Sequence, residues 1–64
     1  MKFILPDRSE LSHEVKGKTI EELLIDINID PLTVLVSKSD TIIPEDTIPD
    51  EDDIIRIIRV SHGG

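Results

Sequence analysis

The sequence predicts an α+β fold in which a single helix packs across a mixed β-sheet. One segment, residues 20–27, carries apolar residues at the helical period, and it is the one convincing helix in the chain. Two strand-like segments precede it and three follow it. The last of these, residues 54–60, is apolar on both faces, which is typical of a central and covered strand. Because a lone helix must bury its apolar stripe against a sheet, the 64 residues are expected to form one two-layer domain.

The first two strands are predicted to pair as a hairpin over residues 1–5 and 10–16. Both segments alternate between apolar and polar residues, and the Pro-Asp-Arg-Ser sequence of residues 6–9 has the composition of a turn. Gly17 and Lys18 end the second strand. The residues expected on one face of the hairpin are Met1, Phe3, Leu5, Leu11, His13 and Val15.

The helix has clear start and stop signals. Thr19 and Glu22 have the spacing of a capping box, in which each side chain satisfies a free backbone N–H of the first turn. Asn28 and Pro31 are expected to close the helix. The predicted apolar stripe consists of Ile20, Leu23, Leu24 and Ile27.

The second half of the chain predicts three strands and an acidic loop. Residues 33–37 and 41–43 have strand character, and residues 44–53 hold two prolines and six acids, which predicts a solvated loop. Only Arg56 and Arg59 interrupt the final apolar strand. The order is therefore β-β-α-β-β-β. If the last strand lies between the first and the third, it runs parallel to the first, which is the β-grasp arrangement.

Composition narrows the classes of function. The chain has no cysteine, which excludes disulfides, thiolate metal sites and a cysteine nucleophile. A net charge of −7 opposes direct binding of nucleic acid and suits either a basic partner surface or simple solubility. No apolar run approaches the roughly 20 residues of a membrane helix, and the N-terminus lacks a signal-peptide pattern. We therefore expect a cytoplasmic protein without membrane contact, too small to hold its own catalytic cleft, and so not an enzyme.

Candidate metal ligands are few. His13 and His62 are the two histidines, and a metal site needs three or four converging ligands, so no metal site is predicted. His13 is expected to be a half-buried strand residue, and His62 an exposed one that could contact a partner. The acids of residues 45–53 lack the glycine and the terminal bidentate glutamate of an EF-hand calcium loop.

Several segments together form a recognisable pattern. They are Lys18-Thr19-Ile20-Glu21-Glu22-Leu23-Leu24, Val34-Leu35-Val36, Asp50-Glu51-Asp52-Asp53, Ile54-Ile55 and Arg59-Val60-Ser61-His62-Gly63-Gly64. In this order they resemble the ThiS/MoaD family of sulfur carriers, which are ubiquitin-like β-grasp proteins. The similarity spans the whole chain, and the last segment is its most specific part.

Two turns depart from that family. The acidic turn of residues 50–53 lacks the glycine that the family usually has before its last strand. Residues 37–40, Ser-Lys-Ser-Asp, stand where the family often has Asn-Gly. Both departures raise the expectation of different local turns, because glycine adopts positive φ more readily than other residues.

The resemblance implies a reactive C-terminus at Gly64. A terminal carboxylate is ionised at neutral pH and is a poor acceptor for a nucleophile. A ubiquitin-activating-like adenylating enzyme would activate it with ATP, and a persulfide sulfur would replace AMP to give a thiocarboxylate on Gly64. A sulfur-accepting synthase or a tRNA thiolase would then take the sulfur, for thiamine thiazole, molybdopterin or thiolated tRNA. Gly64 is thus expected to be a carrier terminus, with no catalytic residue and no stably bound cofactor in this chain.

The residues before Gly64 are expected to guide it into the partner. Gly63 and Gly64 have no side chains, which suits passage through a narrow channel. Residues 61–64 are expected to form a flexible tail after a β-grasp domain of residues 1–60. For the two arginines, ion pairs with acids of a partner and ion pairs within this acidic chain are equally open. The predicted partner-binding residues are Arg56, Arg59, Val60, Ser61 and His62.

Two alternative functions stay open. The same activated carboxylate would serve a ubiquitin-like modifier that is conjugated to lysines through Gly64. An acidic interaction domain with an inert tail is an alternative of another class. The free chain is expected to be a monomer.

Overall fold

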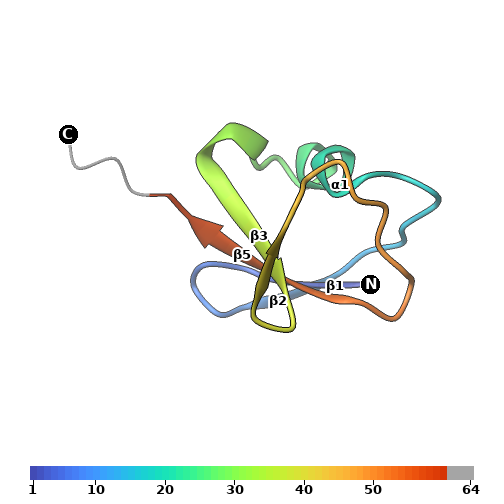
Figure 1. Ribbon diagram of the computed structural model, residues 1–64, viewed down its shortest axis with the longest axis horizontal. Coiled ribbons are helices and arrows are strands. Elements are labelled where there is room, and N and C mark those ends of the chain that lie inside the picture. Colours follow the sequence, from blue (N-terminus) through green and yellow to red (C-terminus); the bar gives the residue numbers. More distant parts are fainter. Residues whose placement is uncertain (61–64) are drawn as a thin grey trace.

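The computed structural model describes residues 1–60, and residues 61–64 lie outside its described part. The elements follow the predicted order, with one short 3-10 helix in addition (Figure 1). They are β1 (Lys2–Ile4), β2 (Glu10–Ser12), α1 (Ile20–Asp26), η1 (Pro31–Thr33), β3 (Val34–Lys38), β4 (Thr41–Ile43) and β5 (Ile54–Arg59).

The last strand, β5, lies at the centre of a sheet with the strand order β2-β1-β5-β3-β4. β1 pairs with β5 in parallel, and the other neighbouring strands pair antiparallel. Phe3 lies opposite Ile55 on one side of β5, and Val36 lies opposite Ile57 on the other. The mixed sheet with its single α-helix confirms the predicted α+β, β-grasp fold (Figure 1).

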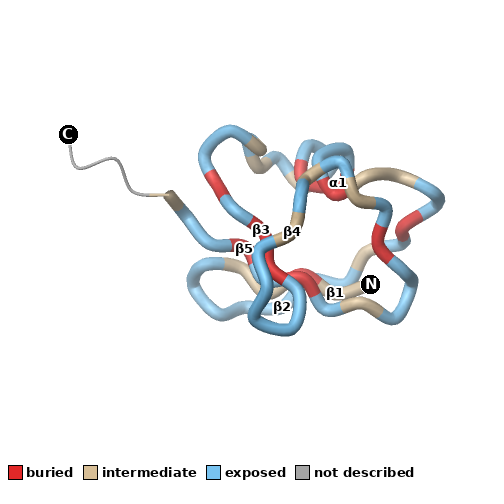
Figure 2. Tube along the Cα trace, viewed as in Figure 1, coloured by how far each residue is buried: buried red, intermediate tan, exposed pale blue. Residues whose placement is uncertain are grey.

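The hydrophobic core lies between α1 and one face of the sheet. Alternate residues of β1 and β5 are buried, as the period of a strand requires, and in β3 Val34, Val36 and Ser37 are buried (Figure 2). The helix contributes Ile20, Leu23 and Leu24, all fully buried as the predicted stripe requires, whereas Ile27 packs at the margin of the core. The buried apolar residues are Phe3, Val15, Ile20, Leu23, Leu24, Val34, Val36, Ile55 and Ile57.

The opposite face of the sheet is open, so the expectation of a β5 covered on both faces is wrong. Ile54 and Ile58 are 53% and 38% exposed, whereas Ile55 and Ile57 between them are at most 2% exposed. The one short α-helix covers the sheet on a single side. We call the exposed side the outer face; its exposed apolar residues are Leu35, Ile42, Ile54 and Ile58.

The first turn of α1 is satisfied by its predicted capping box and by an unpredicted contact with the acidic loop. Thr19 Oγ1 accepts a hydrogen bond from the Glu22 amide at 3.2 Å, and Glu22 Oε1 accepts from the Thr19 amide at 3.0 Å. The Ile20 amide donates to the carbonyl of Thr47, and the next amide donates to the carbonyl of Glu45, both at 2.9 Å. The loop predicted to be solvated is therefore docked on the start of the helix, and it completes the bonding of the first turn.

The two turns that lack glycine adopt different backbone conformations. Ser39 and Asp40 form the tip of the β3–β4 hairpin with φ of 51° and 65°, and both positive values are those that a type I′ turn requires. The turn of residues 50–53 contains no positive φ. It closes through the Asp53 amide on the Asp50 carbonyl at 3.0 Å, so the missing glycine costs no backbone strain there.

β2 is shorter than predicted, and its face is less buried. It ends at Ser12, and Lys16 and Gly17 turn the chain towards α1 with φ of 51° and 71°. Leu11 is 37% exposed because β2 is the edge strand of the sheet. Val15 alone of the predicted inward residues in this segment reaches the core.

The helices of residues 1–60 are short. α1 has seven residues and ends at Asp26; Ile27 is its C-cap, and Asn28 follows with φ 63°. The unpredicted η1 begins at Pro31, where the Asp30 side chain accepts from the Leu32 amide at 2.9 Å. Neither helix has the length and apolar character needed to cross a membrane.

Candidate functional site

β5 carries the described part of the predicted site. Arg56 and Arg59 lie on this strand, and Val60 follows it directly. The Val60 amide donates to the Thr33 carbonyl at 3.0 Å, so bonding on the β3 side continues one residue past the strand. β5 runs away from the end of the molecule at which Met1 lies (Figure 1). The predicted site residues outside the described part are Ser61, His62, Gly63 and Gly64.

The two arginines of β5 leave the strand on different faces. Arg56 lies on the outer face between Ile54 and Ile58, and its register partner on β3 is Ser37. Arg59 comes three residues later, so the alternation of the strand places it on the other face. Both side chains are exposed.

The basic residues fall into two groups by their pairing. All four lysines form ion pairs: Lys2 with Glu10 at 3.0 Å, Lys16 with Glu14 at 3.4 Å, Lys18 with Asp26 at 2.8 Å and Lys38 with Asp53 at 2.9 Å. No arginine forms an ion pair with any acid of residues 1–60. The chain has 14 acids for 7 lysines and arginines, so acids are not in short supply. For Arg56 and Arg59, the alternative of pairing within the described part of the chain is therefore not realised.

The lysine pairs perturb the groups that they join. The hydrogen bond and the charge of Asp26 raise the pKa of Lys18, and the hydrogen bond from Lys18 lowers the pKa of Asp26. A backbone hydrogen bond from Asp50 and then the bond from Lys38 lower the pKa of Asp53. These shifts belong to exposed structural pairs and mark no reactive group.

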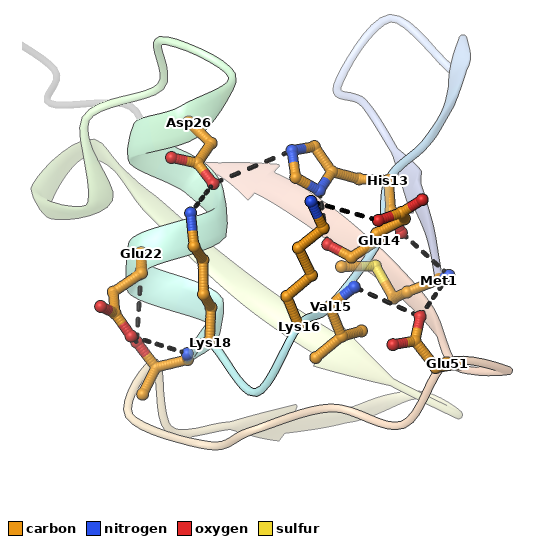
Figure 3. Close-up of polar contacts among 10 residues, drawn as sticks. Met1, His13, Glu14, Val15, Lys16, Lys18, Glu22, Asp26 and Glu51 are labelled. Carbon is orange, nitrogen blue, oxygen red and sulfur yellow. Dashed lines mark hydrogen bonds and ion pairs between the residues drawn. The ribbon is translucent and has the colours of Figure 1, made fainter.

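A polar cluster joins the N-terminal hairpin to α1 (Figure 3). His13 lies just past β2 and is half-buried, as predicted. Its Nε2 lies 3.9 Å from the Asp26 oxygen that Lys18 also contacts, and its Nδ1 lies 2.6 Å from the Glu14 carbonyl. Within residues 1–60, no group of three or more histidines and acids converges as metal ligands would. The cluster therefore connects the N-terminal hairpin to α1.

A second contact ties the hairpin to the acidic loop. Glu51 Oε1 accepts from the Val15 amide at 3.2 Å and lies 4.0 Å from the amino group of Met1 (Figure 3). The Met1 amino group also donates to the His13 carbonyl at 3.0 Å. These bonds hold the segment that delivers Val15 to the core.

One acid of the loop sits in an unfavourable position. Glu45 is half-buried, and its Oε2 has no hydrogen-bond partner among the described residues. Burial raises the pKa of its carboxyl, and the nearby charges of Glu21 and Asp30 raise it further. Its role in the structure is carried by its backbone carbonyl, which caps α1.

No family model matches the chain, but a relative matches it over its whole length. That relative is a protein of Archaeoglobus fulgidus described as uncharacterized, which is 33% identical over 64 residues. The matched span covers all of this chain and 94% of the relative. The chain therefore belongs to the same family as this Archaeoglobus fulgidus protein.

Proposed function

We propose that this protein is a sulfur carrier whose reactive group is the carboxylate of Gly64. The observation that carries the proposal is the position of β5, the central strand of a β-grasp sheet, directly before the last four residues of the sequence. β5 is bonded to β1 as far as Arg56 and to β3 as far as Val60, so β3 holds the end of the strand in place. Four residues span at most about 13–14 Å when extended, which is the greatest reach of Gly64 beyond Val60.

The proposed chemistry proceeds through an activated carboxylate. The Gly64 carboxylate attacks the α-phosphorus of ATP, and pyrophosphate leaves to give an acyl adenylate. The terminal sulfur of a persulfide on the partner then attacks the acyl carbon and displaces AMP. A thiol then attacks the partner's sulfur in the resulting S–S bond, so a new disulfide forms on the partner and a thiocarboxylate leaves on Gly64. A sulfur-accepting synthase or a tRNA thiolase takes the sulfur from there.

The outer face supports the proposal of a protein partner. Its exposed apolar residues lie on β3, β4 and β5, and two of them, Ile54 and Ile58, flank Arg56 along β5. Contiguous exposed apolar side chains commonly mark sites of protein interaction. An adenylating enzyme that holds this face would fix the domain while Gly64 reacts.

Intact mass spectrometry tests the proposal. Protein isolated from its host should be a chain that ends at Gly64, and a fraction should carry sulfur in place of one oxygen. The same product should form from purified protein with ATP, its adenylating enzyme and a sulfur donor. Deletion of Gly64 should abolish the product, whereas the control Ser12→Ala, far along the chain from the terminus, should preserve it. A Gly64 carboxylate that never gains sulfur under these conditions contradicts the proposal.

The same samples separate the two alternatives. A ubiquitin-like modifier would appear as larger lysine conjugates that disappear when Gly64 is deleted. A passive acidic interaction domain would keep its partners and its cellular phenotype after removal of Gly63 and Gly64. The enzyme that co-purifies with the chain would identify the pathway that receives the sulfur.

A further inference from the structure

The central strand has a free edge beyond the end of β1. Parallel pairing with β1 stops at the pair Ile4–Arg56, although β5 continues to Arg59. The Val60 amide bonds to β3, so alternation along the strand turns the backbone groups of Arg59 towards the β1 side. There the chain has reached Pro6, which has no N–H to continue the ladder. The backbone of Arg59 therefore faces an edge that no strand of residues 1–60 covers.

A hollow of about 570 Å³ lies at this free edge. It brings together the turn between β1 and β2 and the last residues of β5, which are far apart in the sequence. We call it the arginine hollow, because its lining includes every arginine of the chain. Its lining residues are Leu5, Pro6, Arg8, Arg56, Ile57, Ile58 and Arg59.

Arg8 lies in the turn between β1 and β2, where no acid of residues 1–60 forms an ion pair with it. The Arg8 amide donates to the Leu5 carbonyl at 2.8 Å, and Arg8 adopts φ 72°. The neighbouring acid, Asp7, uses its Oδ1 to accept from the Ser9 amide at 2.9 Å and from the Ser9 hydroxyl at 2.6 Å. These bonds lower the pKa of Asp7 and keep the oxygen engaged on the side of Ser9. Sequence analysis did not single out Arg8, because only the folded hairpin brings it to β5.

We propose that the arginine hollow binds an extended, acidic segment of a partner protein. Guanidinium groups bind carboxylates through paired hydrogen bonds, and here all three arginines are among the residues that line one hollow. The free edge at Arg59 offers backbone groups to an added strand. The aliphatic lining accepts apolar side chains that alternate with the acids. A lone phosphate ion would bind the arginine charges but would not contact the free strand edge or the aliphatic lining. The net charge of −7 opposes a nucleic acid.

The proposal goes beyond the proposed function. The hollow is made by residues 5–59, so its binding of an acidic segment does not require sulfur on Gly64. The two ideas have separate readouts on the same protein. Peptide binding tests the arginine hollow, and the mass of the chain, with or without sulfur at Gly64, tests the proposed function.

The test is an NMR titration of the ¹⁵N-labelled full chain. The probe is a terminally blocked peptide of eight residues in which glutamate alternates with valine. The amide signals of Ile57, Ile58 and Arg59 should shift in a saturable manner, and a peptide with glutamine in place of glutamate should leave them unchanged. No saturable shift, or shifts centred on another surface, would overturn the proposal. So would inorganic phosphate that reproduces the shifts and displaces the peptide at equal concentration.

Variants assign the binding to the three arginines. Arg56→Gln, Arg59→Gln and Arg8→Asn should each raise the peptide Kd about two- to five-fold, the range expected for exposed ion pairs. Asparagine is chosen for residue 8 because it tolerates positive φ. The triple variant should raise the Kd about tenfold or more, whereas Lys16→Gln, which removes a different exposed cation, should leave it unchanged. Dispersed amide spectra verify that each variant is folded. A triple variant that binds like the wild type refutes the role of the arginines.

Discussion

Shortening Ile55 to valine should destabilise the protein by about 1 kcal/mol, because a buried methylene contributes about 0.8 kcal/mol and leaves a small cavity when removed. Ile55 is 0% exposed, so the full effect applies. The neighbouring Ile54 is 53% exposed, so the same change should cost roughly 0.4 kcal/mol or less. Both variants keep a β-branched residue in the same strand, so strand propensity nearly cancels from the comparison.

Urea unfolding followed by far-UV circular dichroism measures the difference. A chain of this size has an m-value of about 1 kcal/mol per molar urea, so the midpoint should fall by about 1 M for Ile55→Val and by less than about 0.4 M for Ile54→Val. A second pair repeats the test further along the strand. Ile57 is 2% exposed and Ile58 is 38% exposed, so Ile57→Val should again cost more.

Equal costs within a pair would refute the description of the outer face as open. The midpoint should then be measured over a range of protein concentrations. A midpoint that rises with concentration would show that a second copy covers the outer face, because association stabilises the folded state by mass action. A midpoint independent of concentration would agree with the expected monomer.

Four further predictions concern the cap, a turn and two acids. Thr19→Ala should cost about 1 kcal/mol in urea unfolding, because the Glu22 amide loses its acceptor. Asp40→Gly should stabilise the protein by up to about 1 kcal/mol, because Asp40 has φ 65° at a position where glycine is unstrained. The pKa of Asp26 is lowered from 3.8, so its stabilising effect should be full above pH 4 and lost as the pH falls through the lowered value; Asp26→Asn should flatten that loss in an acid titration of stability. Burial raises the pKa of Glu45 above its ordinary value of 4.5, so Glu45→Gln should be more stable than wild type at neutral pH; the advantage should shrink as the pH falls through the raised pKa and vanish below 4.5.

The elements that sequence could predict are those set by local patterns. Thr19 and Glu22 define the start of α1 because capping depends on residues three positions apart. The stripe of α1 is buried where its period places it. The central position of β5 follows from its run of isoleucines, and the position in turn fixes the parallel pairing with β1.

The features that sequence could not predict depend on contacts between distant segments. The acidic loop docks on α1 through backbone carbonyls. Every residue type has such a carbonyl, so the sequence does not reveal this contact. The open outer face arises because one helix covers one side of the sheet, whereas an isoleucine looks the same in sequence on either face. The arginine hollow needs the fold of the hairpin to bring Arg8 beside residues almost 50 positions later. For the candidate site, the sequence identified two of these three arginines and gave no indication that no acid of residues 1–60 would pair with them.

The distribution of charge along β5 gives the arginine hollow a direction. Six of the 14 acids lie in residues 44–53, immediately before the strand begins. The hollow lies around the second half of the strand, and Arg59 is the last residue of that strand. An acidic segment that approaches the sheet is therefore repelled from one end of β5 and attracted to the other. Because such steering acts on the rate of encounter and fades with ionic strength, the association rate of the glutamate peptide should fall more steeply with salt than its dissociation rate rises.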